Sequence, residues 1–290
     1  MDFKDILIVS DYDNTLTGEN HLVPQENLDA IREFTAGGGA FTIGSGRGKR
    51  EWYESFHHVP FNAPLVLSNG AFIYDTEQDK LLYQGVLSDE QRKLVKELFL
   101  SLPRGAGGLI EVGEVSYIPD EIWESSSFHG FPGQPILHPP IDEIPEGWNK
   151  VSFMSPLPEI GKEQRDEAPE GREFDLSKLD TSMMDEVEKR AGEIGLQGIR
   201  SLPFMYEVPP AGVDKGTSAR RLRDILGRKV LAAVGDAQND LAMLRAADLC
   251  FVPRESLLDS DGLVPDNAIR TVRCEGAAIA DVIRILREIN

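Results

Sequence analysis

The sequence predicts an α/β fold in which a parallel sheet lies between two layers of helices and is interrupted by an inserted α+β domain. Short apolar runs alternate with segments of helical spacing near both ends of the chain, a pattern typical of a parallel sheet. The alternation breaks off after residue 83 and resumes near residue 207. Polar turn residues follow four of the apolar runs, where open α/β sheets place their ligand sites.

The N-terminal part begins with the run Ile-Leu-Ile-Val-Ser at 6–10, which indicates a strand buried on both faces. A helix is expected over 24–36, because Pro24 suits a first turn and three glycines at 37–39 end the helical spacing. The remaining elements expected before residue 84 are strands at 40–43 and 65–67, a helix at 48–57 and a hairpin across 72–83.

The middle of the chain has a different pattern. Ser88-Asp89-Glu90-Gln91 is a capping-box sequence and predicts the start of a helix. The further elements expected here are strands at 109–112, 115–118 and 151–154, irregular loops at 128–147 and 161–172, a helix at 180–194, and one bent or two separate strands at 199–208. We therefore place an inserted α+β domain at 84–206, between core segments 1–83 and 207–290.

The first pattern returns in the C-terminal part. The elements expected there are a helix after Lys215-Gly216, a strand at 230–234, a helix from residue 241, a strand at 249–252 and a last helix at 276–289. The last helix carries apolar residues on one side, so it should pack on the sheet.

Composition limits the possible partners. The formal net charge of -19 disfavours binding to nucleic acid or to an anionic membrane surface. No apolar run is long enough for a membrane span and no signal-peptide core is present, so a cytoplasmic, reduced protein is expected. Cys250 and Cys274 have no redox or metal-ligand spacing and are predicted to be buried or partly buried thiols. The histidines are too scattered to predict a zinc site.

Two carboxylates follow the first strand in Asp11-Tyr12-Asp13. Acidic groups this close repel one another unless a cation or a shared proton lies between them, so a divalent metal is one explanation. Solvated loop residues and a nucleotide-sugar site are alternatives. An EF-hand fits poorly, because Leu16 stands where its glycine is required.

Three further motifs favour the metal explanation. They are Ser45-Gly46-Arg47 after the second strand, Lys215-Gly216 at the start of a late helix, and Gly-Asp-Ala-Gln-Asn-Asp at 235–240 after a later strand. In this order, the set resembles the haloacid dehalogenase-like hydrolases. With the insert and Ser-Asn-Gly-Ala at 68–71, the chain resembles their Cof-type sugar-phosphate phosphatases, which have a type IIB cap domain. The resemblance implies a Rossmann-like core.

The resemblance also implies a role for each motif residue. Asp11 would attack phosphorus and form an aspartyl-phosphate, and Asp13 would protonate the leaving oxygen and then activate water. Thr15, Ser45, Gly46 and Lys215 would bind the phosphoryl oxygens. Mg²⁺ would be held by Asp11, the Asp13 carbonyl and Asp236, with Asp240 as a further ligand or as an anchor behind them.

Several of these residues also have structural interpretations. A lysine at a helix start opposes the helix dipole, so Lys215 should have an anionic partner. Ser45 could cap a turn, and Arg47 could form a structural ion pair or lie at the rim of the pocket. Asn239 is expected to orient Asp236 or Lys215. Asn69 is expected near the motifs, where it could contact substrate.

The chain departs from the family pattern at Asn14, where glycine is usual. That glycine serves a turn with positive φ, and asparagine is among the better substitutes for it. We therefore expect the geometry of the turn to be kept.

The function predicted from the sequence is a Mg²⁺-dependent phosphatase of small phosphorylated metabolites, such as sugar or polyol phosphates, acting as a monomer or homodimer. A phosphomannomutase-like phosphotransferase is one alternative, because a capped relative catalyses that reaction. A non-catalytic phospho-ligand-binding protein is a second alternative, but it would have no need for Asp11, Asp13 and Lys215 together.

Overall fold

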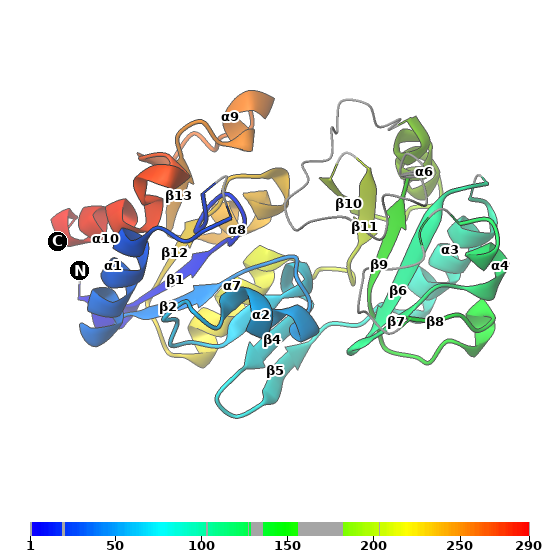
Figure 1. Cartoon of the computed structure of the whole chain (residues 1–290), viewed down its shortest axis with the longest axis horizontal. Coiled ribbons are helices and arrows are strands. Elements are labelled where there is room, and N and C mark those ends of the chain that lie inside the picture. Colours follow the sequence, from blue (N-terminus) through cyan, green and yellow to red (C-terminus); the bar gives the residue numbers. More distant parts are fainter. Residues whose placement is uncertain are drawn as a thin grey trace, which may run out of the picture. The chain divides into compact units, whose positions relative to one another are not determined.

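The computed structural model describes residues 2–18, 21–102, 104–126, 128, 136–155, 182–202 and 204–289 (Figure 1). The chain divides into two compact units: the core unit, residues 1–85 with 212–290, and the insert unit, residues 86–211. These boundaries lie two and five residues after the predicted ones at 84 and 206. Across the described ranges, no helix has the length and apolarity needed to cross a membrane.

The core unit is built on a five-stranded parallel sheet of order β14-β13-β12-β1-β2. Its strands are β1 (Ile6–Ser10), β2 (Ala40–Ile43), β12 (Val230–Val234), β13 (Leu249–Pro253) and β14 (Ile269–Thr271). The central strand β1 pairs in parallel with both β2 and β12. The predicted parallel α/β core is therefore confirmed.

Helices cover both faces of this sheet. They are α1 (Gln25–Ala36), α2 (Trp52–Phe56), α7 (Lys215–Ile225), α8 (Leu241–Ala246), α9 (Leu257–Asp261) and α10 (Ala278–Glu288). Ile6 and Ile8 of β1 belong to a hydrophobic cluster with residues of α1 and α10. Leu7 and Val9 belong to a second cluster with residues of α7 and α8. Because successive strand residues point to opposite faces, this division explains the continuous apolar run.

The third predicted strand differs from expectation. β3 (Leu65–Leu67) pairs with β4 (Phe72–Asp75), and β4 pairs with β5 (Lys80–Gln84), in a separate antiparallel sheet. Its link to the end of β2 is a single parallel bridge between Gly44 and Val66. The helix expected at 48–57 begins as a 3-10 turn, η2 (Lys49–Glu51), before α2.

The insert unit contains a six-stranded sheet of order β10-β11-β9-β6-β7-β8, antiparallel except between β7 and β8. Its strands are β6 (Gly107–Val112), β7 (Val115–Tyr117), β8 (Ile136–Leu137), β9 (Trp148–Met154), β10 (Ile199–Leu202) and β11 (Met205–Val208). Its helices are α3 (Asp89–Leu100), α4 (Asp120–Trp123) and α6 (Ser182–Glu193). The insert is thus α+β, as predicted.

One predicted detail of the insert is confirmed and another differs from the prediction. Ser88 caps α3 as expected, because its Oγ accepts from the Gln91 N–H at 3.2 Å and the Gln91 side chain accepts from the Ser88 N–H. The loop expected at 128–147 includes β8 and a 3-10 turn, η4 (Ile141–Glu143), so it is more regular than predicted. The loop expected at 161–172 lies outside the described residues.

Candidate active site

The two principal carboxylates lie at the carboxyl ends of neighbouring strands. Asp11 follows β1 directly, and Asp236 comes two residues after β12. The strands pair in register to their last residues, Ser10 and Val234, and the Asp11 N–H extends the ladder by donating to the Val234 carbonyl at 2.9 Å. The pairing of β1 with β12 therefore brings together two acidic residues that are 225 positions apart in the sequence.

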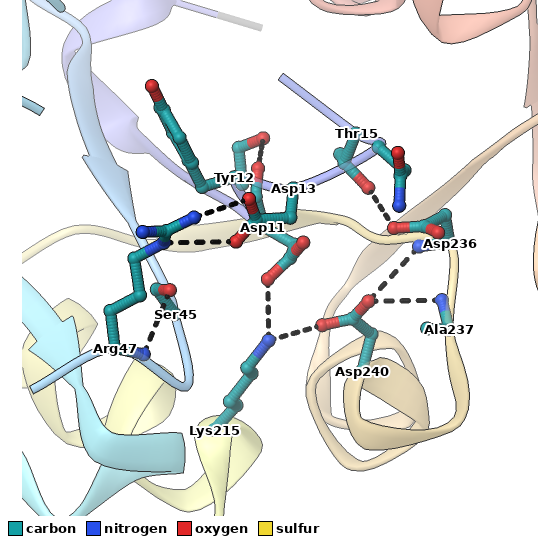
Figure 2. A network of polar contacts seen from close by, with 12 residues as sticks. Asp11, Tyr12, Asp13, Thr15, Ser45, Arg47, Lys215, Asp236, Ala237 and Asp240 are labelled. Carbon is teal, nitrogen blue, oxygen red and sulfur yellow. Dashed lines mark hydrogen bonds and ion pairs between the residues drawn. The ribbon is translucent and has the colours of Figure 1, made fainter. Parts of the chain in front are cut away.

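Lys215 joins the first of these carboxylates to a third one. Its Nζ donates to Asp11 Oδ1 at 2.6 Å and to Asp240 Oδ1 at 2.7 Å (Figure 2). The Lys215 side chain is 0% exposed although Lys215 is the first residue of α7. The sequence predicts an anionic partner for this lysine, and the structure provides two.

Asp240 is held by protein donors through both of its oxygens. Its Oδ2 accepts from the backbone N–H groups of Asp236 at 3.1 Å and Ala237 at 3.2 Å, while Oδ1 accepts from Lys215. A side chain at Gly235 would clash here, because a Cβ would lie 2.5 Å from the Asp240 Cβ. Of the two roles considered for Asp240, a further metal ligand and an anchor behind the ligands, this geometry favours the anchor.

The turn after β1 contains the residue that departs from the family pattern. Asn14 has φ 57, so the expectation that this turn needs a positive φ is confirmed. The next residue, Thr15, is fully buried and its hydroxyl donates to Asp236 Oδ1 at 2.7 Å. The family resemblance implies that this hydroxyl binds phosphoryl oxygens, whereas in the structure it donates to a carboxylate.

Burial and mutual repulsion perturb the acidic groups. The pKa of Asp11 lies well above its usual range, because burial and the charge of Asp240 outweigh the attraction of Lys215. Burial and Asp240 also raise the pKa of Asp236 to about 7. Burial lowers the pKa of Lys215, but its two carboxylate partners outweigh that effect and hold the pKa above its ordinary value.

These observations fit a divalent cation. Asp11, Asp236 and Asp240 offer oxygens that lie within 4.8 Å of one another. The second oxygens of Asp11 and Asp236 accept no hydrogen bond from any residue that the structure describes. Four carboxylates, counting Asp13, face only two cations, so the site has a formal surplus of negative charge that would repel a phosphate. An oxygen-rich site of this charge suits Mg²⁺.

Asp13 forms its ion pair with Arg47 and not with Lys215. Arg47 binds both of its oxygens, Nε to Oδ2 at 3.1 Å and Nη2 to Oδ1 at 2.8 Å (Figure 2). The pair is accessible, with side-chain exposures of 40% for Asp13 and 37% for Arg47. Arg47 therefore forms the ion pair considered for it, and its place at the rim of a pocket stays a prediction.

Two loops meet beside this pair. Ser45 is buried and its Oγ accepts from the Arg47 N–H at 3.1 Å, which is the turn-capping role considered for it. Asn69 is also buried, its N–H donates to the Ser45 carbonyl at 3.0 Å, and a Cβ on Gly46 would lie 3.3 Å from its Oδ1. The expectation that Asn69 lies near the motifs is therefore met. Asn239 is half-buried in the turn η6 (Gln238–Asp240), and its orienting role stays a prediction.

Some residues that shape the site are absent from the sequence-based prediction. The guanidinium carbon of Arg47 lies 5.7 Å from the ring centroid of Tyr12. The Nη1 atom of Arg47 donates to Ser55 Oγ at 3.3 Å. The Leu258 N–H in α9 donates to the Asp236 carbonyl at 2.9 Å. A signal for α9 exists, because Ser256 and Asp259 form a capping box. Nothing in the sequence around Ser55 indicates its contact.

The chain is similar to known proteins along most of its length. The model of the haloacid dehalogenase-like hydrolase family matches residues 8–252. YxeH of Bacillus subtilis (strain 168), which is named as a phosphatase, is 26% identical over 250 residues, 83% of this chain and 84% of its own length. The 5-amino-6-(5-phospho-D-ribitylamino)uracil phosphatase YwtE of the same organism is 25% identical over 266 residues, again 83% and 84%.

A solved structure shares the fold of both units. The structure described as the HAD subclass IIB sugar phosphatase BT4131 superposes with a TM-score of 0.68 over 97% of this chain and 98% of its own. At 16% sequence identity, this similarity concerns the fold alone.

Proposed function

The chain belongs to the haloacid dehalogenase-like hydrolases, and from this premise we propose that it is a Mg²⁺-dependent phosphatase that hydrolyses small phosphorylated metabolites. The observation that carries the proposal is the buried chain of contacts Asp11–Lys215–Asp240, beside Asp236, at the carboxyl ends of β1 and β12. It holds a carboxylate next to a fixed cation, which is the arrangement that nucleophilic attack on an anionic phosphate requires.

In the first proposed step, a carboxylate oxygen of Asp11 attacks phosphorus. The bond from phosphorus to the alcohol oxygen breaks, and Asp13 gives its proton to that oxygen as the alcohol leaves. Lys215 offsets the negative charge between the carboxylate and the phosphoryl group. The Ser45 hydroxyl and the Gly46 N–H, which donates to no residue in the described ranges, can bind phosphoryl oxygens.

In the second proposed step, water attacks the aspartyl-phosphate. Asp13 takes a proton from the water, the bond from phosphorus to Asp11 breaks, and inorganic phosphate and the Asp11 carboxylate are released. Mg²⁺, held by Asp11, Asp236 and the Asp13 carbonyl, would supply positive charge to the phosphoryl group when bound. Asp240 keeps Lys215 in place and, through the Asp236 N–H, fixes the loop that carries the second ligand.

The substrates that we propose are sugar or polyol phosphates. YwtE is named for a substrate that carries a phosphorylated ribityl chain, and BT4131 is described as a sugar phosphatase. We further propose that the insert unit is a type IIB cap that selects among such substrates. The motif residues support this division of roles, because all of them belong to the core unit.

The test is an assay of inorganic phosphate release over a panel of sugar, polyol and nucleotide phosphates, with Mg²⁺ or with EDTA. We expect release with Mg²⁺ alone and without any bisphosphate activator, which distinguishes a phosphatase from a phosphomutase. The Asp11→Asn variant serves as the control for contaminating phosphatases. Absence of release from every member of the panel, or equal release by the variant, would contradict the proposal.

A further inference from the structure

The Arg47–Asp13 pair has a two-point geometry. The guanidinium binds both carboxylate oxygens, at 3.1 and 2.8 Å, and such two-point pairs fix orientation as well as charge. Both Asp13 oxygens therefore face the guanidinium while the pair is closed. The pair is about two-fifths exposed, so an incoming anion can reach the guanidinium.

The protein holds the arginine from several sides. Nη1 donates to Ser55 Oγ at 3.3 Å, and the guanidinium carbon lies 5.7 Å from the ring centroid of Tyr12, a distance typical of a cation–π contact. Tyr12 is itself fixed, with 6% exposure and an edge contact to Phe56 at 4.7 Å between centroids. Because Tyr12 separates Asp11 from Asp13, the same residue links the position of the arginine to the nucleophile loop.

The backbone of Arg47 is clamped by an unusual turn. Its carbonyl accepts from the Ser68 N–H at 2.8 Å. Ser68, Asn69 and Gly70 all have positive φ, at 49, 52 and 100, values that non-glycine residues adopt rarely. Ser68 and Asn69 are both buried, so the surrounding structure maintains this turn where the loop of Arg47 rests on it.

We propose that Arg47 is the positioning residue of Asp13: it holds the carboxyl at the rim of the site and releases it when the phosphate of a substrate takes the guanidinium. This inference rests on the proposed function and deepens it. It implies that the enzyme is built for esters of ordinary alcohols, whose alkoxide leaves poorly and needs the Asp13 proton. Esters of acidic phenols need that proton far less.

The experiment compares kcat/KM for glycerol 2-phosphate and for p-nitrophenyl phosphate in wild type, Arg47→Met and Arg47→Lys. The value of kcat/KM reports the steps up to loss of the alcohol, so it isolates the step in which Asp13 acts as an acid. Methionine keeps an apolar stem against Tyr12 but removes the charge. Lysine keeps the charge but not the two-point geometry. Arg32→Ala, which removes an exposed ion pair to Asp29 in α1, is the matched control.

We expect Arg47→Met to lower kcat/KM about 100-fold for the glycerol ester and less than about tenfold for the p-nitrophenyl ester. Arg47→Lys should recover part of the loss for the glycerol ester, and Arg32→Ala should change neither value. An equal loss for both esters, or no loss in either, would overturn the proposal. Failure of the wild-type protein to hydrolyse either ester would instead contradict the proposed phosphatase activity, so the two failures are distinguishable.

Discussion

Each unit of the molecule has a buried lysine between two carboxylates, and the two clusters differ in where they lie on their sheets. In the core unit, Lys215 contacts Asp11 at 2.6 Å and Asp240 at 2.7 Å. In the insert unit, Lys150 contacts Glu207 at 3.1 Å and Glu111 at 3.5 Å. Each lysine thus has two carboxylate partners, although the core cluster is the more deeply buried of the two.

Their positions within the strands separate them. Lys150 lies within β9, Glu111 within β6 directly opposite it, and Glu207 within β11 on the other side of β9. All three side chains thus come from residues within paired strands, where they support one another across the sheet. The core cluster lies where strands end, and a further carboxylate, Asp236, adds to its negative charge.

We infer from this difference that a buried ion pair does not by itself indicate a functional site. A cross-strand pair completes the packing of a sheet face, whereas an excess of carboxylates at strand ends leaves oxygens that an added cation can use. The predictions below test whether the two clusters divide in this way, with chemistry in the core unit and stability in the insert unit.

The largest effect is expected at the nucleophile. Asp11→Asn should lower kcat by at least about 10⁴-fold, because the amide cannot form the covalent intermediate. The fold should persist, since the change removes one charge from a site where carboxylates repel one another. Rates of phosphate release and thermal unfolding curves check both parts. A loss of less than tenfold would show that Asp11 is not the nucleophile.

Metal removal should act on the core cluster alone. EDTA should reduce activity about 10³-fold and Mg²⁺ should restore it, because a bound cation contributes several kcal/mol of charge stabilisation. Ca²⁺ in excess should inhibit, since it accepts more ligands at longer distances and can draw both oxygens of Asp11 onto the metal. The measurement is the initial rate of phosphate release in metal-free buffer and at increasing concentrations of Mg²⁺ or Ca²⁺. Full activity in EDTA would exclude the metal site.

Matched changes at the two lysines compare the clusters directly. Lys215→Met should lower kcat/KM by about 100- to 1,000-fold, as the loss of a preorganised charge at a reaction centre does. Lys150→Met should leave kcat/KM for p-nitrophenyl phosphate within about threefold of wild type. It should lower the free energy of unfolding by about 3 kcal/mol, because the buried Glu207 and the partly exposed Glu111 lose a cationic partner. Kinetics and urea denaturation of both variants provide the test. A large activity loss in Lys150→Met would contradict a purely structural role for the Lys150 cluster.

The smallest effect is expected at a partly exposed pair of the core unit. Arg270 binds both oxygens of Asp259, and this hydrogen bonding lowers the pKa of Asp259 from 3.8 to about 2. A depressed pKa contributes stability above about pH 4 that is lost as the pH falls towards 2. Asp259→Asn should therefore cost less than about 1 kcal/mol at pH 7, and the difference from wild type should shrink between pH 4 and pH 3. Urea denaturation of both proteins at several pH values measures this difference in unfolding free energy. A difference that does not change with pH would contradict the lowered pKa of Asp259.

Much of this protein was predictable from the sequence by itself. A strand that is buried on both faces has a continuous apolar run, so the sequence predicts β1, β2, β12 and β13 close to their observed bounds. The capping box at Ser88 located α3 because its two hydrogen bonds are local. Even the positive φ of Asn14 followed from the motif, since few residues other than glycine adopt it readily.

What the sequence missed depends on contacts between distant residues. The separate antiparallel pairing of β3 and the short strand β14 have no local signature, because three residues are too few to show a period. The Thr15 hydroxyl could have faced a phosphate or a carboxylate, and only the parallel pairing of β1 with β12 brings Asp236 within 2.7 Å of it. In the same way, Arg47 became a partner of Asp13 only through tertiary structure, because a guanidinium binds whichever carboxylate the fold places beside it.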